Sequence, residues 1–116
     1  MSMKPSTLYT TFPDAQTANK AARTLIDKRL IACANIIKDV TTFYRWEGNV
    51  CEENECILIG KTSLAVSPQI ISELKILHPY DEPAIVFLPV TDGSASYVHW
   101  IQEQLGAYKE THECIN

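Results

Sequence analysis

The sequence predicts an α+β domain with a ferredoxin-like βαβ-βαβ arrangement, on three observations. Extended and helical patterns follow one another in the order strand, helix, strand, strand, helix, strand. The middle of the chain is rich in β-forming residues and turns back on itself, which predicts a long hairpin. A further helical pattern follows the last strand, so we expect an extra C-terminal helix.

The size and composition of the chain fit one domain. It has 116 residues, of which 46% are hydrophobic and 21% are charged. A chain of this length buries roughly two thirds of the surface that it exposes when unfolded, and such a composition argues against disordered and fibrous proteins. We therefore assign residues 1–116 to a single domain, with residues 1–6 and 107–116 as flexible ends.

The first part of the chain predicts a strand followed by a helix. Residues 7–12 are rich in β-branched and aromatic types, and Pro13-Asp14 then offers a helix cap. Residues 15–29 follow as a helix, because their apolar side chains recur at helical spacing on one face. That face consists of Ala18, Ala21, Ala22, Leu25 and Ile26.

The middle of the chain predicts the two strands of the hairpin. Residues 31–46 are rich in β-forming types after a start of small residues, and we expect an interruption near Lys38-Asp39. Residues 47–49 have turn chemistry, and residues 50–61 supply the second extended stretch.

The last part of the chain predicts a helix, a strand and the terminal helix. Ser67-Pro68 reads as a cap followed by a proline, and Pro79 stops that helix. The apolar residues 84–90 are expected to form a buried strand. Ser94 caps the terminal helix, and Gly106 ends it. The expected inner face of this helix consists of Tyr97, Val98, Ile101 and Leu105.

This arrangement leaves part of the sheet without cover. In a ferredoxin-like domain the helices lie on one sheet face, so the other face and the ends of the long hairpin are bare. Bare apolar sheet surface and bare edges normally associate with other chains. We therefore expect self-assembly.

Charge and cysteine content limit the partners and the compartment. The net charge is −4 and the pI about 5.3, without a run of basic residues, so nucleic acid is not an expected partner. Residues 1–7 lack the apolar stretch of a secretory signal, and no apolar run approaches the roughly 20 residues of a membrane span. We expect a cytoplasmic protein whose cysteines, Cys33, Cys51, Cys56 and Cys114, are free thiols.

Three groups of residues are candidates for a binding site. Tyr44 and Trp46 share a strand face beside the hairpin turn, either as pocket lining or as anchors for another subunit. Glu55 and Lys61 lie six residues apart and also share a face, either in a polar cleft or as unrelated surface charges. His78 ends a helix, where imidazole serves as a copper or zinc ligand or as a cap for helix carbonyls.

Several stretches, in their order and spacing, are similar to the CutA divalent-cation-tolerance family. They are ACANII at 32–37, YRWEG at 44–48, residues 55–62, His78-Pro79-Tyr80 with Pro83, and YVHWI at 97–101. The resemblance covers about residues 8–105. It implies a ferredoxin-like protomer, a homotrimer built by strand pairing between long hairpins, and a non-enzymatic role in tolerance to divalent cations, copper above all.

The resemblance also implies a site at clefts between the subunits of the homotrimer. The implied ligand cleft consists of Tyr44, Trp46, Glu55, Lys61, His78 and Tyr80. Within it, His78 is the leading metal ligand and Glu82 a secondary one, for copper or another divalent cation that folding does not require.

Two positions depart from the family pattern. Thr10 stands where bacterial members often have a cysteine, and a hydroxyl is a poor ligand for soft or borderline metals. Ala84 stands where members commonly have a glutamate, so one carboxylate is lost. A second hypothesis therefore stays open: a trimeric protein similar to PII-type regulators that binds a small ligand or a protein partner and affects metals indirectly.

Overall fold

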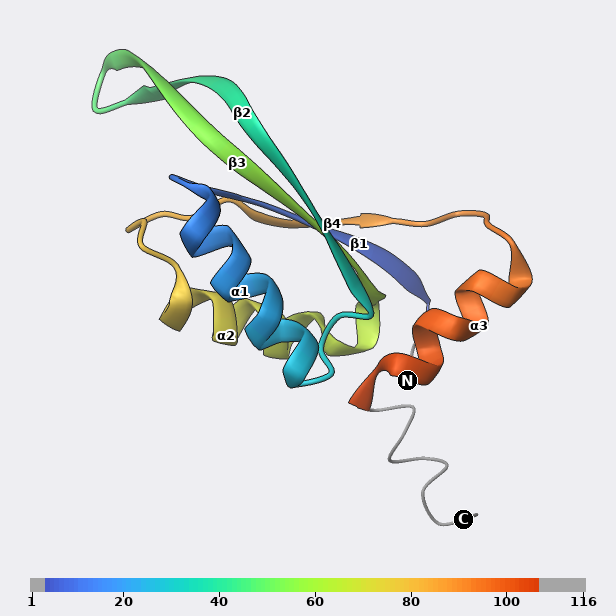
Figure 1. Ribbon diagram of the computed structural model, residues 1–116. Helices are drawn as coiled ribbons and strands as arrows, with labels where there is room; N and C mark the ends of the chain where they lie inside the picture. Colours follow the sequence, from blue (N-terminus) through green and yellow to red (C-terminus); the bar gives the residue numbers. More distant parts are fainter. Residues whose placement is uncertain (1–3, 107–116) are drawn as a thin grey trace.

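Strands and helices follow one another in the predicted order (Figure 1). The computed structural model describes residues 4–106. Its strands are β1 (Pro5–Phe12), β2 (Cys33–Trp46), β3 (Asn49–Ser63) and β4 (Ile85–Pro89). Its helices are α1 (Ala15–Asp27), the short 3-10 helix η1 (Leu64–Val66), α2 (Ser67–Leu77) and α3 (Ala95–Gln104).

The four strands form one antiparallel sheet in the order β2-β3-β1-β4. Helices α1 and α2 lie along one face of this sheet, and the β2–β3 hairpin projects past them (Figure 1). Helix α3 follows β4 and lies toward the other end of the sheet from the hairpin tip (Figure 1). The predicted ferredoxin-like α+β fold, with its long hairpin and extra C-terminal helix, is confirmed.

The core lies between the sheet and helices α1 and α2. The sheet contributes Leu8, Phe12 and Leu58, and the two helices contribute Leu25 and Leu74, all fully buried. Alternate residues of a strand point to the same face, so β1 and β3 direct one apolar set toward the helices. Complete burial of one such side chain stabilises the fold by about 1.5–3 kcal/mol.

A β-bulge interrupts β2 where the sequence predicts an interruption. Ile37 pairs with Ile57, but Val40 pairs with Glu55, so β2 has one residue more than β3 in this stretch. Asp39 has a left-handed φ of 59°, which aspartate tolerates better than most residues. Because side chains alternate with a period of two, the extra residue exchanges the two faces of β2 beyond this point.

The hairpin tip is a tight turn between β2 and β3. Glu47 and Gly48 connect the strands with φ angles of 50° and 84°. Two successive residues with positive φ are typical of the type I′ turn, whose twist matches that of paired strands. The turn predicted at residues 47–49 is confirmed.

The ends of most elements differ from the prediction by one or two residues, and three of these differences matter most. β1 begins at Pro5, so residues 5 and 6 belong to the sheet and not to a flexible end. α1 ends at Asp27, two residues earlier than expected, and Arg29 then has a left-handed φ of 58°. In α2, Val66 holds the cap position, while Ser67 is already helical and donates its hydroxyl hydrogen to the Leu64 carbonyl.

Residues 84–90 were predicted to form a buried strand. A strand does form there, as β4, but it is not buried. β4 pairs only with β1 and forms one edge of the sheet. Ile85 and Phe87 pack against the core, whereas Val86 and Leu88 are 51% and 48% exposed on the face opposite α1 and α2. An apolar run shows that a strand forms, but it does not show that both of its faces are covered.

The terminal helix is anchored by its C-terminal half. Ile101 and Leu105 are buried, as predicted, but Tyr97 is 43% exposed, so its assignment to the inner face is wrong. The Tyr97 hydroxyl lies 3.5 Å from Cys33 Sγ at the start of β2. At the C-terminal end of α3, the Arg29 guanidinium donates a hydrogen bond to the Glu103 carbonyl at 3.1 Å.

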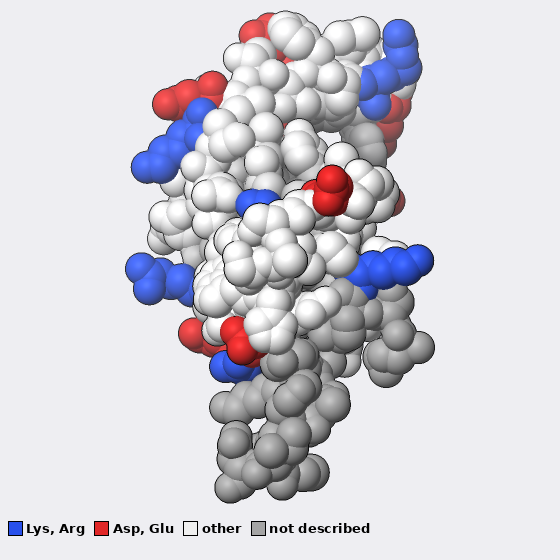
Figure 2. Space-filling view, turned by 90° about the vertical axis from the view of Figure 1, so that its right-hand side faces the viewer, with Lys and Arg blue, Asp and Glu red and all other residues white. Residues whose placement is uncertain are grey.

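The sheet face opposite α1 and α2 exposes apolar side chains. Ile37 of β2 lies on it together with Val86 and Leu88 of β4. Seen from the side of α3, charged side chains lie mainly along the margins of the molecule (Figure 2). Within residues 4–106, each helix is too short or too polar to cross a membrane.

Candidate functional site

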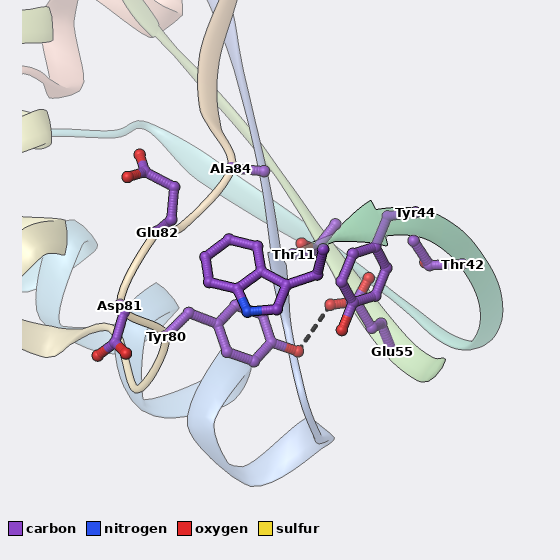
Figure 3. Close-up of a pocket in the computed structure, with 9 residues that line it drawn as sticks. Thr11, Thr42, Tyr44, Glu55, Tyr80, Asp81, Glu82 and Ala84 are labelled. Carbon is purple, nitrogen blue, oxygen red and sulfur yellow. Dashed lines mark hydrogen bonds between the residues drawn. The ribbon is translucent and has the colours of Figure 1, made fainter. Parts of the chain in front are cut away.

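A pocket of about 440 Å³ lies between the hairpin and the loop that joins α2 to β4 (Figure 3). Strands and loop contribute to it together. From β1, β2 and β3 come Thr11, Thr42, Tyr44, Trp46 and Glu55, and from the loop come Tyr80, Asp81, Glu82 and Ala84. Its volume is in the range of sites for small molecules, about 300–1,000 Å³.

Two local features of the chain bring these side chains together. The bulge at Asp39 turns Tyr44 and Trp46 to the same face as Glu55, because an unbroken β2 would present them on the opposite face. On the other side of the pocket, His78 is extended, with φ −78° and ψ 134°. A following proline favours that conformation, and the chain then turns so that Tyr80 reaches Glu55.

Glu55 and Tyr80 form the polar centre of the pocket. The Tyr80 hydroxyl donates a hydrogen bond of 2.6 Å to Glu55 Oε2 (Figure 3). Glu55 is only 5% exposed, although it is a carboxylate. Burial, and then this hydrogen bond to Glu55, strongly raise the pKa of Tyr80, so the phenol keeps its proton at neutral pH.

Tyr44 and Trp46 supply an aromatic wall that remains partly open to solvent. Their side chains are 40% and 48% exposed. Desolvation and the nearby Glu53 raise the pKa of Tyr44, so it is also a neutral phenol near pH 7. Their shared face, which the sequence predicts, is confirmed by the strand register.

His78 lies next to the pocket but does not line it. Its ring stacks on Phe12 with the centroids 4.2 Å apart, and its Nδ1 accepts the Tyr80 backbone N–H at 3.3 Å. Its Nε2 lies 3.4 Å from the Thr10 hydroxyl oxygen. Burial lowers the pKa of His78, and a hydrogen bond to the Thr11 backbone and the charge of Glu55 oppose that shift only in part. The imidazole is therefore neutral at pH 7.

Comparison with known proteins assigns this chain to a family. The profile of the CutA1 divalent ion tolerance proteins matches residues 6–104. The chain belongs to the CutA1 family. A divalent-cation tolerance protein CutA from Thermus thermophilus is 40% identical over 96 residues, which are 83% of this chain and 93% of that protein.

Two further members of the CutA1 family show how widely the likeness extends. Protein CutA of Mus musculus is 33% identical over 84% of this chain, which spans only 55% of the mouse protein. The structure of the periplasmic divalent cation tolerance protein CutA from Archaeoglobus fulgidus has a TM-score of 0.84 and 31% identity. That comparison covers 86% of this chain and 97% of the other.

The fold gathers most, but not all, of the cleft residues expected from the CutA resemblance. Tyr44, Trp46, Glu55 and Tyr80 line one pocket, and Glu82 lines it as well. Lys61 shares a face with Glu55 but lies six residues further along β3, about 20 Å away at 3.3 Å per residue. Within one chain, Lys61 is therefore outside the pocket.

Besides Asp81 of the loop, two lining residues on strands escaped the sequence-based prediction. Thr11 faces the pocket because it pairs with Ile57, on the same sheet face as Glu55. Thr42 faces it because the bulge exchanges the faces of β2. The alternation of β1 could have indicated Thr11 once its register with β3 was known, whereas no single motif marks Thr42.

The donor set fits a metal ion only in part. Within residues 4–106, no three His, Cys, Asp or Glu side chains converge on one point. The carboxylates of Asp81 and Glu82 point away from Glu55 (Figure 3). Thr10 is fully buried against His78 and Ala84 lines the pocket, and neither offers a strong ligand.

Proposed function

We propose that this CutA-family chain acts in divalent-cation tolerance or homeostasis, as a homotrimer that binds copper or another divalent cation at clefts between its subunits. The proposed role is binding, without catalysis. The observation that carries the proposal is the match to divalent ion tolerance proteins over residues 6–104, nearly the whole chain.

The bare sheet face supports the homotrimer. Ile37, Val86 and Leu88 expose apolar surface on the face opposite α1 and α2, and β2 and β4 are open edges. Association would remove this apolar surface from water, which stabilises the assembly by roughly 25 cal/mol for each Å² buried. It would also pair the free strand edges. The β2–β3 hairpin projects past α1 and α2 (Figure 1), and in the proposed homotrimer it contacts a neighbouring copy.

The electrostatics beside the hairpin support a cation as the ligand. Glu55, Asp81 and Glu82 line the pocket, and none of its lining residues is basic. His78 adds a neutral imidazole whose Nδ1 accepts the Tyr80 backbone N–H, so its Nε2 carries the proton. To bind a metal through Nδ1, His78 would have to give up this hydrogen bond. In the proposed site, a neighbouring copy completes the ligand set.

Calorimetric titration with Cu(II), and with Zn(II) for comparison, tests this function. The protein is held at near-neutral pH while light scattering records its mass. We expect a trimer with one saturable site per chain, weakened at least tenfold by His78→Ala. His99→Ala, on exposed α3, is the matched control and should leave the affinity unchanged. Binding without defined stoichiometry would remove the metal site from the proposal.

A second function, a PII-like trimer that binds a small ligand or a protein partner, is favoured by one specific observation. Tyr44, Trp46 and Tyr80 make the pocket wall largely aromatic, and aromatic walls suit organic ligands better than bare metal ions. Trp46→Leu separates the two functions, because it should weaken an organic ligand and leave the affinity for Cu(II) unchanged.

We also propose a cytosolic location. Cys33, Cys51 and Cys56 are free thiols in the part of the chain that the structure describes, as is typical of reducing compartments. Cell fractionation should recover the protein with cytosolic markers, whereas recovery with periplasmic markers would contradict this location.

A further inference from the structure

The pocket combines aromatic faces with negative charge. Three of the nine lining residues are aromatic (Tyr44, Trp46 and Tyr80) and three are acidic (Glu55, Asp81 and Glu82). Both kinds of group attract cations, the carboxylates by their charge and the rings by the negative potential of their faces. A site of about 440 Å³ is much larger than a bare metal ion needs.

We propose that this pocket binds a small organic ammonium ion, with its positive nitrogen against the aromatic rings and its charge balanced by Glu55. The inference rests on the proposed function, because both use this pocket as the ligand site. It adds the chemical class of the ligand. Quaternary and protonated primary amines share the required chemistry.

The burial of Glu55 is the first argument for a cationic ligand. A buried carboxylate is costly unless charges or hydrogen bonds compensate it. The Tyr80 hydroxyl supplies one neutral donor, while a carboxylate has about four acceptor sites. Within residues 4–106 no basic side chain forms an ion pair with Glu55. An ammonium ion in the pocket would supply the missing positive charge.

The aromatic residues are the second argument. Tyr44 and Trp46 remain about half exposed beside a buried carboxylate, so their ring faces are available to a ligand. A cation within about 6 Å of such a ring is attracted to its face, most strongly by tryptophan. Asp81 and Glu82 point away from Glu55, so they contribute negative potential and not a chelating cage (Figure 3).

Choline is the probe, and the two tryptophans of the chain are the reporters. Trp46 lines the pocket and Trp100 lies on α3, so their indole N–H signals in a two-dimensional NMR spectrum separate the site from the rest of the surface. We expect a saturable shift of the Trp46 signal while the Trp100 signal stays. The neutral isostere 3,3-dimethylbutan-1-ol should bind about fivefold more weakly or worse.

Two variants with matched controls test the named residues, and both keep the Trp46 reporter. Tyr44→Leu should weaken choline about fivefold, and Glu55→Gln, which can still accept the Tyr80 hydrogen bond, at least tenfold. Phe43→Leu and Glu52→Gln, on the other face of the hairpin, should change nothing. Butylammonium is the second ligand to be tested. If Glu55→Gln weakens the binding of butylammonium more than that of choline, the preferred ligand is a primary amine.

The outcomes separate this inference from the proposed function. Equal affinity for choline and its neutral isostere, an unmoved Trp46 signal, or equal losses in the control variants would overturn the ammonium site. Cu(II) binding without choline binding also overturns it and leaves the metal function in place. Choline binding without Cu(II) binding supports the ammonium site and removes the metal function, and binding of neither removes both.

Discussion

The Tyr80 hydroxyl lies 2.6 Å from Glu55 Oε2 and donates a hydrogen bond to it across 25 positions of sequence. This contact joins the loop after α2 to strand β3 and closes the pocket on its polar side. Glu55 is only 5% exposed. Within residues 4–106, Tyr80 is the only side chain that donates a hydrogen bond to its carboxylate.

Removal of that donor should destabilise the fold. Tyr80→Phe keeps the ring but leaves Glu55 without its hydrogen bond, and a bond to a charged group contributes about 1.5–3 kcal/mol. We expect the free energy of unfolding in urea to fall by about 1.5 kcal/mol. Tyr97→Phe is the control, because among residues 4–106 that hydroxyl contacts only the Cys33 thiol, at 3.5 Å. Equal losses in the two variants would contradict a special role for the contact.

The stability of the protein should fall on mild acidification because of His78. Burial lowers its pKa in the folded state below the ordinary value of 6.5, so the unfolded chain takes up the proton first. The stabilisation is complete above about pH 6.5 and is lost as the pH falls through the pKa of the folded state. Melting temperatures at pH 7.5, 6.5 and 5.5 measure this.

His78→Gln removes the titrating group, so its melting temperature should depend less on pH across that range. His99→Gln, at an exposed position of α3, should keep the dependence of the original chain. A dependence that survives unchanged in His78→Gln would assign the effect to another group.

Self-association should depend on the bare sheet face. Val86→Lys places a charge among the apolar side chains of that face, and burial of an unpaired charge is costly. Light scattering at low micromolar protein should then report a smaller mass than that of the original chain. Ile76→Lys is the matched control, because Ile76 is 79% exposed on α2, away from this face. A variant Val86→Lys with unchanged mass would exclude the face as the interface.

The bulge should tolerate only residues that accept a left-handed backbone. Asp39 has a φ of 59°, which costs a β-branched residue about 1–2 kcal/mol. Asp39→Val should therefore lower the free energy of unfolding by about 1 kcal/mol, while Asp39→Gly should leave it nearly unchanged. If both variants unfold at the same urea concentration, backbone strain is not what selects aspartate here.

Much of the fold is readable from local patterns. The apolar spacing of residues 15–29 and the β-rich stretches around a turn at 47–49 depend on neighbours in sequence, so their element types were predicted correctly. The errors lie where burial depends on distant parts of the chain. Val86 is apolar in a strand-like run, but only the tertiary structure shows that β4 is an edge with one bare face.

The candidate site shows the same division. The fold class, the hairpin, the shared face of Tyr44 and Trp46, and the family resemblance follow from residue type and spacing, so they can be predicted without a structure. The tertiary structure decided that the extra residue at Asp39 turns Tyr44 and Trp46 toward Glu55, and that Lys61 stays outside their pocket. A bulge changes the direction of every later side chain, and the meeting of Tyr80 with Glu55 depends on packing between distant segments, which spacing along the chain does not encode.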